Sequence, residues 1–225
     1  RYTNKYKTRN HLQRSIMKEY LKITNECNME LMKRYPDNHF DLAIVDPPYG
    51  IDINSSGRLG HYGGKGKKWD NKIPNDIYFK ELNRVSKNQI IWGGNYFNLQ
   101  PTRCFLIWDK QQPEGVSFAS CEFAWTSFNK SAKTFYMRPQ NADENRIHPT
   151  QKPKSLYQWL LTKYAEPNFK ILDTHLGSGS IAIAVDSVNK IEKMNLTLTA
   201  CELDTEYYQT ATQRIKEQTT WNSLF

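Results

Sequence analysis

The chain has 225 residues and a formal net charge of +8, with 31 lysines and arginines against 23 aspartates and glutamates. Such a charge suggests an anionic partner, most directly nucleic acid, and the alternative is a soluble basic protein without such a partner. No apolar run is long enough to cross a membrane, and the basic residues 1–20 lack the apolar core of a signal peptide. The four cysteines are scattered without a CxxC pair, which indicates neither a zinc site nor a disulfide framework. Reduced thiols in a cytoplasmic protein are therefore expected.

Strand-like and helix-like segments alternate along most of the chain, which predicts an α/β fold. No linker or repeat divides the sequence, so a single domain over 1–225 is expected. Two aromatic-rich strand candidates, 104–110 and 122–129, follow each other with no helix between them, as an antiparallel edge pair would. The expected elements, in chain order, are strand 21–24, helix 28–35, strand 41–46, helix 75–88, strand 89–94, the two strands just named, a helix within 148–164, strand 169–173, an apolar helix, and strand 196–203.

The stretch DLAIVDPPYG at 41–50 is the first candidate site. Its apolar run fits an interior strand of a parallel sheet, which places Asp46 at the carboxyl end, where open α/β sheets bind ligands. Pro47 and Pro48 lack an N–H group and leave their carbonyl oxygens free to accept hydrogen bonds. An acceptor-rich turn followed by Tyr49 indicates binding of a flat group that carries an amine.

The loop at 51–72 combines glycines with an excess of basic residues. Because it follows the candidate turn directly, it could close over a nucleic-acid backbone, and the alternative is an ordinary solvated loop. Its expected phosphate contacts are Arg58, Lys65, Lys67 and Lys68.

A second candidate site lies where strand 169–173 ends at Asp173 and a loop containing Gly177 and Gly179 leads into a helix. Small residues at a helix start let backbone N–H groups approach a ligand. The next strand ends at Glu202, the position from which nucleotide-binding α/β folds hold ribose hydroxyls. Together these features indicate a cofactor that contains adenosine.

In this order, the motifs resemble those of S-adenosylmethionine-dependent DNA amino-methyltransferases of the class whose catalytic motif precedes its cofactor motif. The DPPY-type catalytic motif is matched at 46–49, and the HPTQKP-type segment is matched letter for letter at 148–153. The DPFxGSGT-type cofactor loop is matched in part at 173–180, with Thr174 and His175 where the family usually has Pro and Phe. The resemblance implies a Rossmann-like, mostly parallel sheet with helices on both faces and an antiparallel edge hairpin.

The resemblance also implies the chemistry and the residues that carry it. Asp46 and the Pro47 carbonyl would accept the two hydrogens of an exocyclic amine, and Tyr49 would stack on a base flipped out of the duplex. The methyl group of S-adenosylmethionine is already activated, so no metal is expected. The expected cofactor-binding residues are His148, Thr150, Gln151, Lys152, Asp173, Thr174, His175, Leu176, Gly177, Ser178, Gly179, Ser180, Glu202 and Leu203.

The favoured reaction is methylation of adenine N6 in DNA. Methylation of cytosine N4 is the nearest alternative, although it more often goes with Ser in place of Asp46. A non-catalytic homologue that binds cofactor or nucleic acid and an RNA substrate are weaker alternatives. The short stretch 110–147 is the candidate target-recognition region. A homodimer is compatible with the sequence, as is a cognate restriction nuclease, which nothing in the chain indicates.

Overall fold

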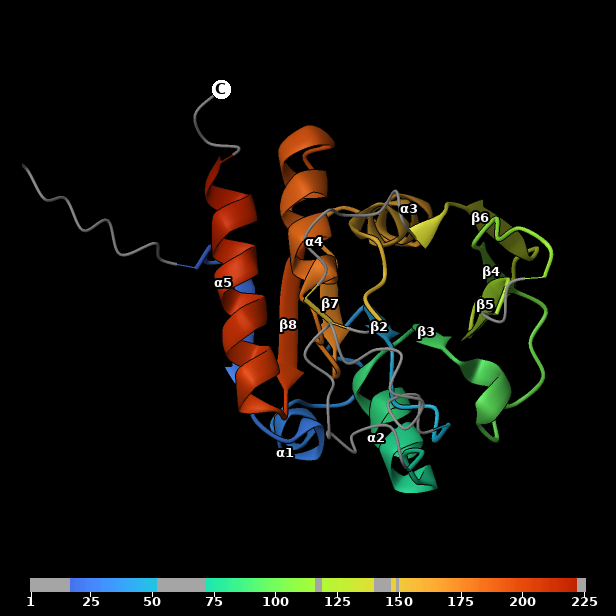
Figure 1. Ribbon diagram of the computed structural model, residues 1–225. Helices are drawn as coiled ribbons and strands as arrows, with labels where there is room; N and C mark the ends of the chain where they lie inside the picture. Colours follow the sequence, from blue (N-terminus) through green and yellow to red (C-terminus); the bar gives the residue numbers. More distant parts are fainter. Residues whose placement is uncertain (1–16, 52–71, 116–118, 140–146, 149, 222–225) are drawn as a thin grey trace, which may run out of the picture.

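A computed structural model describes residues 17–51, 72–115, 119–139, 147–148 and 150–221 (Figure 1). Within them, one eight-stranded sheet has the order β1-β8-β7-β2-β3-β5-β4-β6. The strands are β1 (Leu21–Asn25), β2 (Leu42–Val45), β3 (Gln89–Trp92), β4 (Phe105–Asp109), β5 (Cys121–Thr126), β6 (Lys133–Tyr136), β7 (Lys170–Asp173) and β8 (Thr197–Glu202). The helices are α1 (Asn28–Lys33), α2 (Asp76–Val85), α3 (Lys154–Tyr164), α4 (Ser180–Ile191) and α5 (Thr205–Trp221), with a short 3-10 turn at Gly94–Tyr96.

The order of the strands creates a switch point at the centre of the sheet. β2 pairs in parallel with both β3 and β7. From β2 the chain continues outward through β3, whereas from β7 it continues in the other direction through β8. Ligands of open α/β sheets bind at the carboxyl ends of the strands at such a point. The fold therefore brings the segment after β2 beside the segment after β7.

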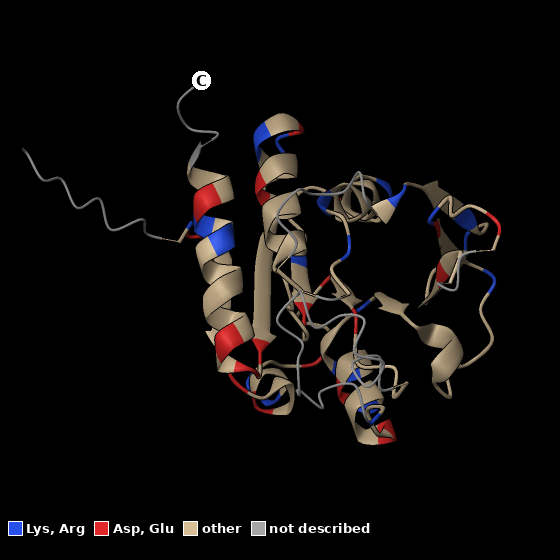
Figure 2. Ribbon diagram, viewed as in Figure 1, with Lys and Arg blue, Asp and Glu red and all other residues tan. Residues whose placement is uncertain are grey.

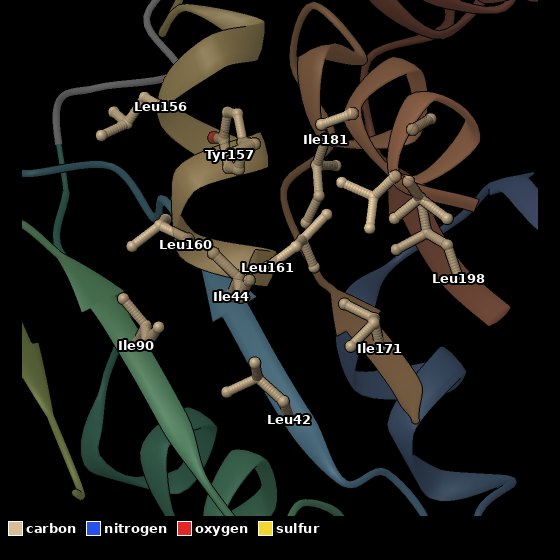
Figure 3. Packing of buried hydrophobic residues seen from close by; sticks show 14 of the residues in the cluster. Leu42, Ile44, Ile90, Leu156, Tyr157, Leu160, Leu161, Ile171, Ile181 and Leu198 are labelled. Carbon is tan, nitrogen blue, oxygen red and sulfur yellow. The ribbon is translucent and has the colours of Figure 1, made fainter. Parts of the chain in front are cut away.

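The central strands are apolar because both faces of the sheet are covered. Successive side chains of a strand point to opposite faces, so Leu42 and Ile44 join the hydrophobic cluster under α3, α4 and α5. Ala43 and Val45 join the cluster under α1 and α2 on the other face. Figure 3 shows the first cluster, with Leu156 and Leu160 of α3 above Ile44 and Ile90. Figure 2 shows charged residues on helices, strands and loops, including the acidic tip of β8.

The predicted fold class is confirmed, with two elements added. The expected antiparallel pair is β4 with β5, and β5 runs opposite to the other strands of the sheet. This pair is not the outermost one, because β6 lies beyond it and pairs in parallel with β4. Helix α5 was also not predicted. It packs through Ala211 and Ile215, which are spaced one turn apart and belong to the same cluster as α4.

Candidate active site

Two cavities meet at the switch point. The first has a volume of about 260 Å³ and lies between the turn after β2 and the strand β5. The second has a volume of about 380 Å³ and lies over the loop after β7 and the end of β8. Asp46, Pro48, Thr150 and Lys152 line both cavities, so a molecule in one lies next to a molecule in the other.

Asp46 is at the shared wall, held by two donors. Its Oδ2 lies 2.5 Å from the ammonium nitrogen of Lys152, and its Oδ1 accepts a hydrogen bond of 2.6 Å from the Tyr49 hydroxyl. Burial and the negative charge of Glu122 raise the pKa of Asp46, whereas the Lys152 ammonium lowers it, and the net direction is upward. The carboxylate is thus a better proton acceptor than an exposed aspartate.

Tyr49 is positioned by close packing in the first cavity. Its ring stacks on Tyr96, with centroids 5.1 Å apart and planes inclined by 13°. A Cβ atom at Gly93 would lie 2.2 Å from the Tyr49 ring, and Gly93 has a φ of +70°, so this position needs glycine. Tyr96, which lines the same cavity and is 44% exposed, therefore covers one face of the Tyr49 ring.

Most of the predicted cofactor residues line the second cavity. These are His148, Thr150, Gln151, Lys152, Thr174, His175, Leu176, Gly177, Ser178, Glu202 and Leu203. Lys152 also lines the first cavity, where it contacts Asp46. The sequence motif did not predict this contact.

Three predicted residues lie behind this lining. Asp173 is buried and accepts a hydrogen bond from the backbone N–H of His175, and burial raises the pKa of its carboxyl to about 8. Gly179 is the N-cap residue before α4, with a φ of +76°, and a Cβ there would lie 2.6 Å from Ile215 of α5. Ser180 contacts Ser178 and Arg214 through its hydroxyl. These three residues shape the loop rather than the cavity surface.

Glu202 is presented to the second cavity by backbone groups. Its Oε2 accepts from the N–H of Gly177 at 2.9 Å and its Oε1 from the N–H of Asp204 at 3.0 Å. Burial raises the pKa of this carboxyl, and the two N–H groups oppose the shift. The adjacent Leu203 is 73% exposed. A fixed carboxylate beside an uncovered apolar side chain fits a ribose that carries a planar base, so this cavity fits an adenosine cofactor.

Thr174 and His175, which stand where the family motif usually has Pro and Phe, are held by a hydrogen-bond network. Asn28 Nδ2 lies 3.1 Å from His175 Nε2, and Thr174 Oγ1 lies 2.9 Å from His175 Nδ1. Since an amide nitrogen only donates, Nε2 accepts and the proton is on Nδ1, facing Thr174. Thr174 in turn contacts the Tyr78 hydroxyl at 2.7 Å. Burial lowers the pKa of His175 to about 3, so the ring is neutral at physiological pH.

Sequence reasoning missed several residues of the site. Asn28 and Tyr78 are on helices, and their ordinary helical spacing concealed their contacts with His175 and Thr174. Glu122 lines the first cavity from β5, where the one available signal was an acidic residue within an aromatic-rich strand. The predicted phosphate contacts Arg58, Lys65, Lys67 and Lys68 lie outside the described residues.

Fold and site together define an α/β protein with two adjoining cavities at the switch point of its sheet, an arrangement that can hold two ligands side by side. None of the described helices has the length and apolar character needed to cross a bilayer. Within the described part of the chain, no group of His, Cys, Asp and Glu side chains could hold a metal ion.

Comparison with known proteins identifies the family. Residues 64–213 match the profile of the N6/N4 DNA methylase family, and the chain belongs to this family. It is 24% identical to the type II methyltransferase M.BglII of Bacillus subtilis, covering 96% of this chain and 75% of that protein. It is 23% identical to the putative methylase YubD of Escherichia coli strain K12, covering 72% of this chain and 78% of that protein. The family resemblance drawn from the sequence motifs is thus confirmed.

Solved structures show the same fold. The complex of M1.HpyAVI with S-adenosylmethionine superposes with a TM-score of 0.58 at 18% identity, covering 87% of this chain and 98% of the other. The cytosine-N4-specific PvuII DNA methyltransferase superposes with a TM-score of 0.56 at 12% identity, covering 89% and 93%. The protein is therefore a DNA methyltransferase of the N6/N4 family with the fold predicted from its sequence.

Proposed function

We propose that the protein transfers a methyl group from S-adenosylmethionine to N6 of an adenine that has been flipped out of DNA. The observation that carries this proposal is the position of Asp46 at the wall shared by two cavities. The second cavity would hold the cofactor, with Glu202 at its ribose hydroxyls. The first cavity would hold the target base, which must leave the helix to reach a carboxylate inside a cavity.

When bound, the cofactor supplies a methyl group that its positively charged sulfur already activates. The residues of this chain bind the amine, orient it and accept its proton. Asp46 and the Pro47 carbonyl each accept one hydrogen of the exocyclic amine, which draws its lone pair out of the ring and toward the cofactor cavity. Asp46 then takes up the proton that the nitrogen releases, and the raised pKa of its carboxyl supports this role. Holding both reactants in adjoining cavities supplies much of the rate enhancement.

Adenine is preferred to cytosine because the motif begins with Asp46 rather than serine. The relatives include a cytosine-N4-specific structure, so the target base is the point to test. We also propose that residues 1–225 act as one methyltransferase unit. Residues 110–147 would contribute to target recognition, which is supported by Lys110, Cys121 and Glu122 lining the first cavity.

The test is methyl transfer from isotopically labelled S-adenosylmethionine to mixed-sequence duplex DNA, followed by digestion and mass spectrometry of the nucleosides. The expected product is N6-methyldeoxyadenosine. If N4-methyldeoxycytidine is the sole methylated nucleoside, the target base is cytosine rather than adenine. Cofactor binding without any labelled nucleoside, on DNA or on RNA, would contradict the enzymatic proposal. The exposed surface variant Asp37→Ala is the matched control for Asp46→Ala.

A further inference from the structure

Four charged side chains of alternating sign line the first cavity in a continuous row. Lys110 lies 2.7 Å from Glu122, Glu122 lies 3.0 Å from Lys152, and Lys152 lies 2.5 Å from Asp46. They come from four places in the chain: the end of β4, the strand β5, the segment before α3 and the turn after β2. The row therefore exists only in the folded protein.

Lys152 lies between the two carboxylates of this row and is the most buried of the four side chains. Its side chain is 2% exposed, whereas those of Asp46 and Glu122 are each 20% exposed. An ammonium removed from water to this extent is stable only when it is paired. Lys152 has two carboxylates within reach, and Lys110 balances the second. The row therefore contains two positive and two negative groups, which together carry no net charge.

Glu122 contacts Lys152 through opposite charges and a side-chain hydrogen bond. Oε2 of Glu122 is buried and lies 3.0 Å from the ammonium nitrogen. The same ammonium donates hydrogen bonds to Asp46 and to the Tyr49 hydroxyl. The negative charge of Glu122 thus competes with that of Asp46 for the ammonium of Lys152.

From this geometry we infer that Glu122 is a positioning residue for the methyl transfer, because its charge keeps Lys152 shared between two carboxylates. Without that charge, Lys152 would pair with Asp46 alone, and Asp46 would be less available to the amine of the target base. This inference rests on the proposed role of Asp46 as the acceptor of that amine.

The charge of Glu122 also sets the protonation of Asp46. Glu122 is one of the groups that raise the pKa of the Asp46 carboxyl, and Lys152 lowers it. Removing the negative charge of Glu122 must therefore lower the pKa of Asp46. Removing the positive charge of Lys110 has the opposite effect, because Glu122 then takes a larger share of Lys152. The titratable and charged groups around Asp46 are Tyr49, Tyr78, Lys110, Glu122, Lys152, Tyr157 and Asp173.

The experiment compares Glu122→Gln and Lys110→Met with the wild type in steady-state methyl transfer to DNA from pH 5 upward. Glu122→Gln keeps the shape of the side chain and removes its charge. We expect kcat to fall by up to about 100-fold, the cost of misplacing a working group by roughly 1 Å. The acidic limb of kcat/KM, which reports the essential base, moves to lower pH in Glu122→Gln and to higher pH in Lys110→Met. Affinity for S-adenosylmethionine remains that of the wild type in both.

Two further variants separate positioning from simple structural damage. Glu122→Asp keeps the charge and restores the acidic limb of the wild type. Glu166→Gln, at an exposed glutamate after α3, is the control and changes neither kcat nor the acidic limb of the kcat/KM profile. Wild-type kcat and an unmoved limb in Glu122→Gln would overturn the inference while leaving the proposed function intact. If Glu122→Gln fails to fold, the test rests on Lys110→Met. An acidic limb of kcat/KM at the wild-type pH in Lys110→Met would then overturn the inference. A wild-type protein that transfers no methyl group to DNA would instead refute the proposed function.

Discussion

The ammonium nitrogen of Lys152 lies 2.5 Å from Oδ2 of Asp46, although the two residues are 106 positions apart in the sequence. Lys152 belongs to the HPTQKP segment, which the sequence associated with the cofactor, and Asp46 begins the DPPY motif. Their contact ties the two halves of the proposed site together at the shared wall of the two cavities.

This contact makes Lys152 important for stability as well as for activity. Lys152→Met should lower the free energy of unfolding by about 3–5 kcal/mol, because it leaves two partly buried carboxylates without their shared partner. Lys152→Arg, which keeps the positive charge, should lower the free energy of unfolding by less. Urea denaturation at pH 7 measures the effect, with the exposed Lys163→Met as a control expected within about 0.5 kcal/mol of the wild type. Equal stability of Lys152→Met and Lys163→Met would show that the ion pairs contribute nothing.

Substitution of Asp46 should separate chemistry from folding. Asp46→Ala should abolish methyl transfer, whereas Asp46→Asn keeps an acceptor oxygen and should retain a trace. Both variants should fold, because Glu122 continues to pair with the buried Lys152. Labelled methyl transfer and thermal unfolding followed by circular dichroism measure the two properties. Normal turnover by Asp46→Ala would refute the mechanism.

Glu202 should control cofactor affinity. Loss of a charge-assisted hydrogen bond to a buried partner costs about 1.5–3 kcal/mol, so Glu202→Ala should weaken S-adenosylmethionine binding roughly 10- to 100-fold. Isothermal calorimetry measures this, with Glu217→Ala, an exposed glutamate on α5, as the matched control. Equal affinity in Glu202→Ala and the wild type would place the ribose elsewhere.

His175 should make the folded state sensitive to acid. Its pKa is lowered to about 3 in the folded protein, against 6.5 for the free side chain. Below pH 6.5 the unfolded chain binds a proton that the folded protein does not, so stability is lost as the pH falls toward 3. The loss attributable to His175 approaches about 1.4 kcal/mol for each pH unit. His175→Gln should remove this component, which urea denaturation at pH 7 and pH 5 would reveal as a smaller loss than in the wild type. Parallel losses in the two proteins would contradict the buried neutral imidazole.

The basic residues of the 51–72 loop should contribute to DNA binding without sequence preference. Replacing Lys65, Lys67 and Lys68 by alanine should weaken binding equally on unrelated duplexes, because phosphate contacts carry no sequence information. Each lost contact should flatten the plot of log affinity against log salt concentration by about 0.9. Fluorescence anisotropy at several salt concentrations measures this, and cofactor affinity serves as the internal control. An unchanged slope would move the phosphate contacts to other basic residues, such as those in 1–16.

The sequence by itself determined the local elements and the identity of the motifs. The apolar run at 42–45 is a buried strand, Asp46 directly follows it, and Glu202 ends β8 as predicted. These features depend on neighbouring residues, through the alternation of side chains along a strand and the backbone limits of proline and glycine. The family motifs added the DNA methylase function because their joint order along the chain is specific.

The tertiary structure alone decided which motif residues meet and which lie behind the cavity surface. Gly179 and Ser180 belong to the cofactor motif yet contact Ile215 and Arg214 of α5, a helix that the sequence reading did not assign. Glu122 belongs to no motif yet lies 3.0 Å from Lys152. Such contacts depend on the order of strands within the sheet. Glu122 on β5 lines the same cavity as the turn after β2, although β3 lies between the two strands in the sheet. β3 ends at Trp92, and the next residue, Gly93, packs against the Tyr49 ring.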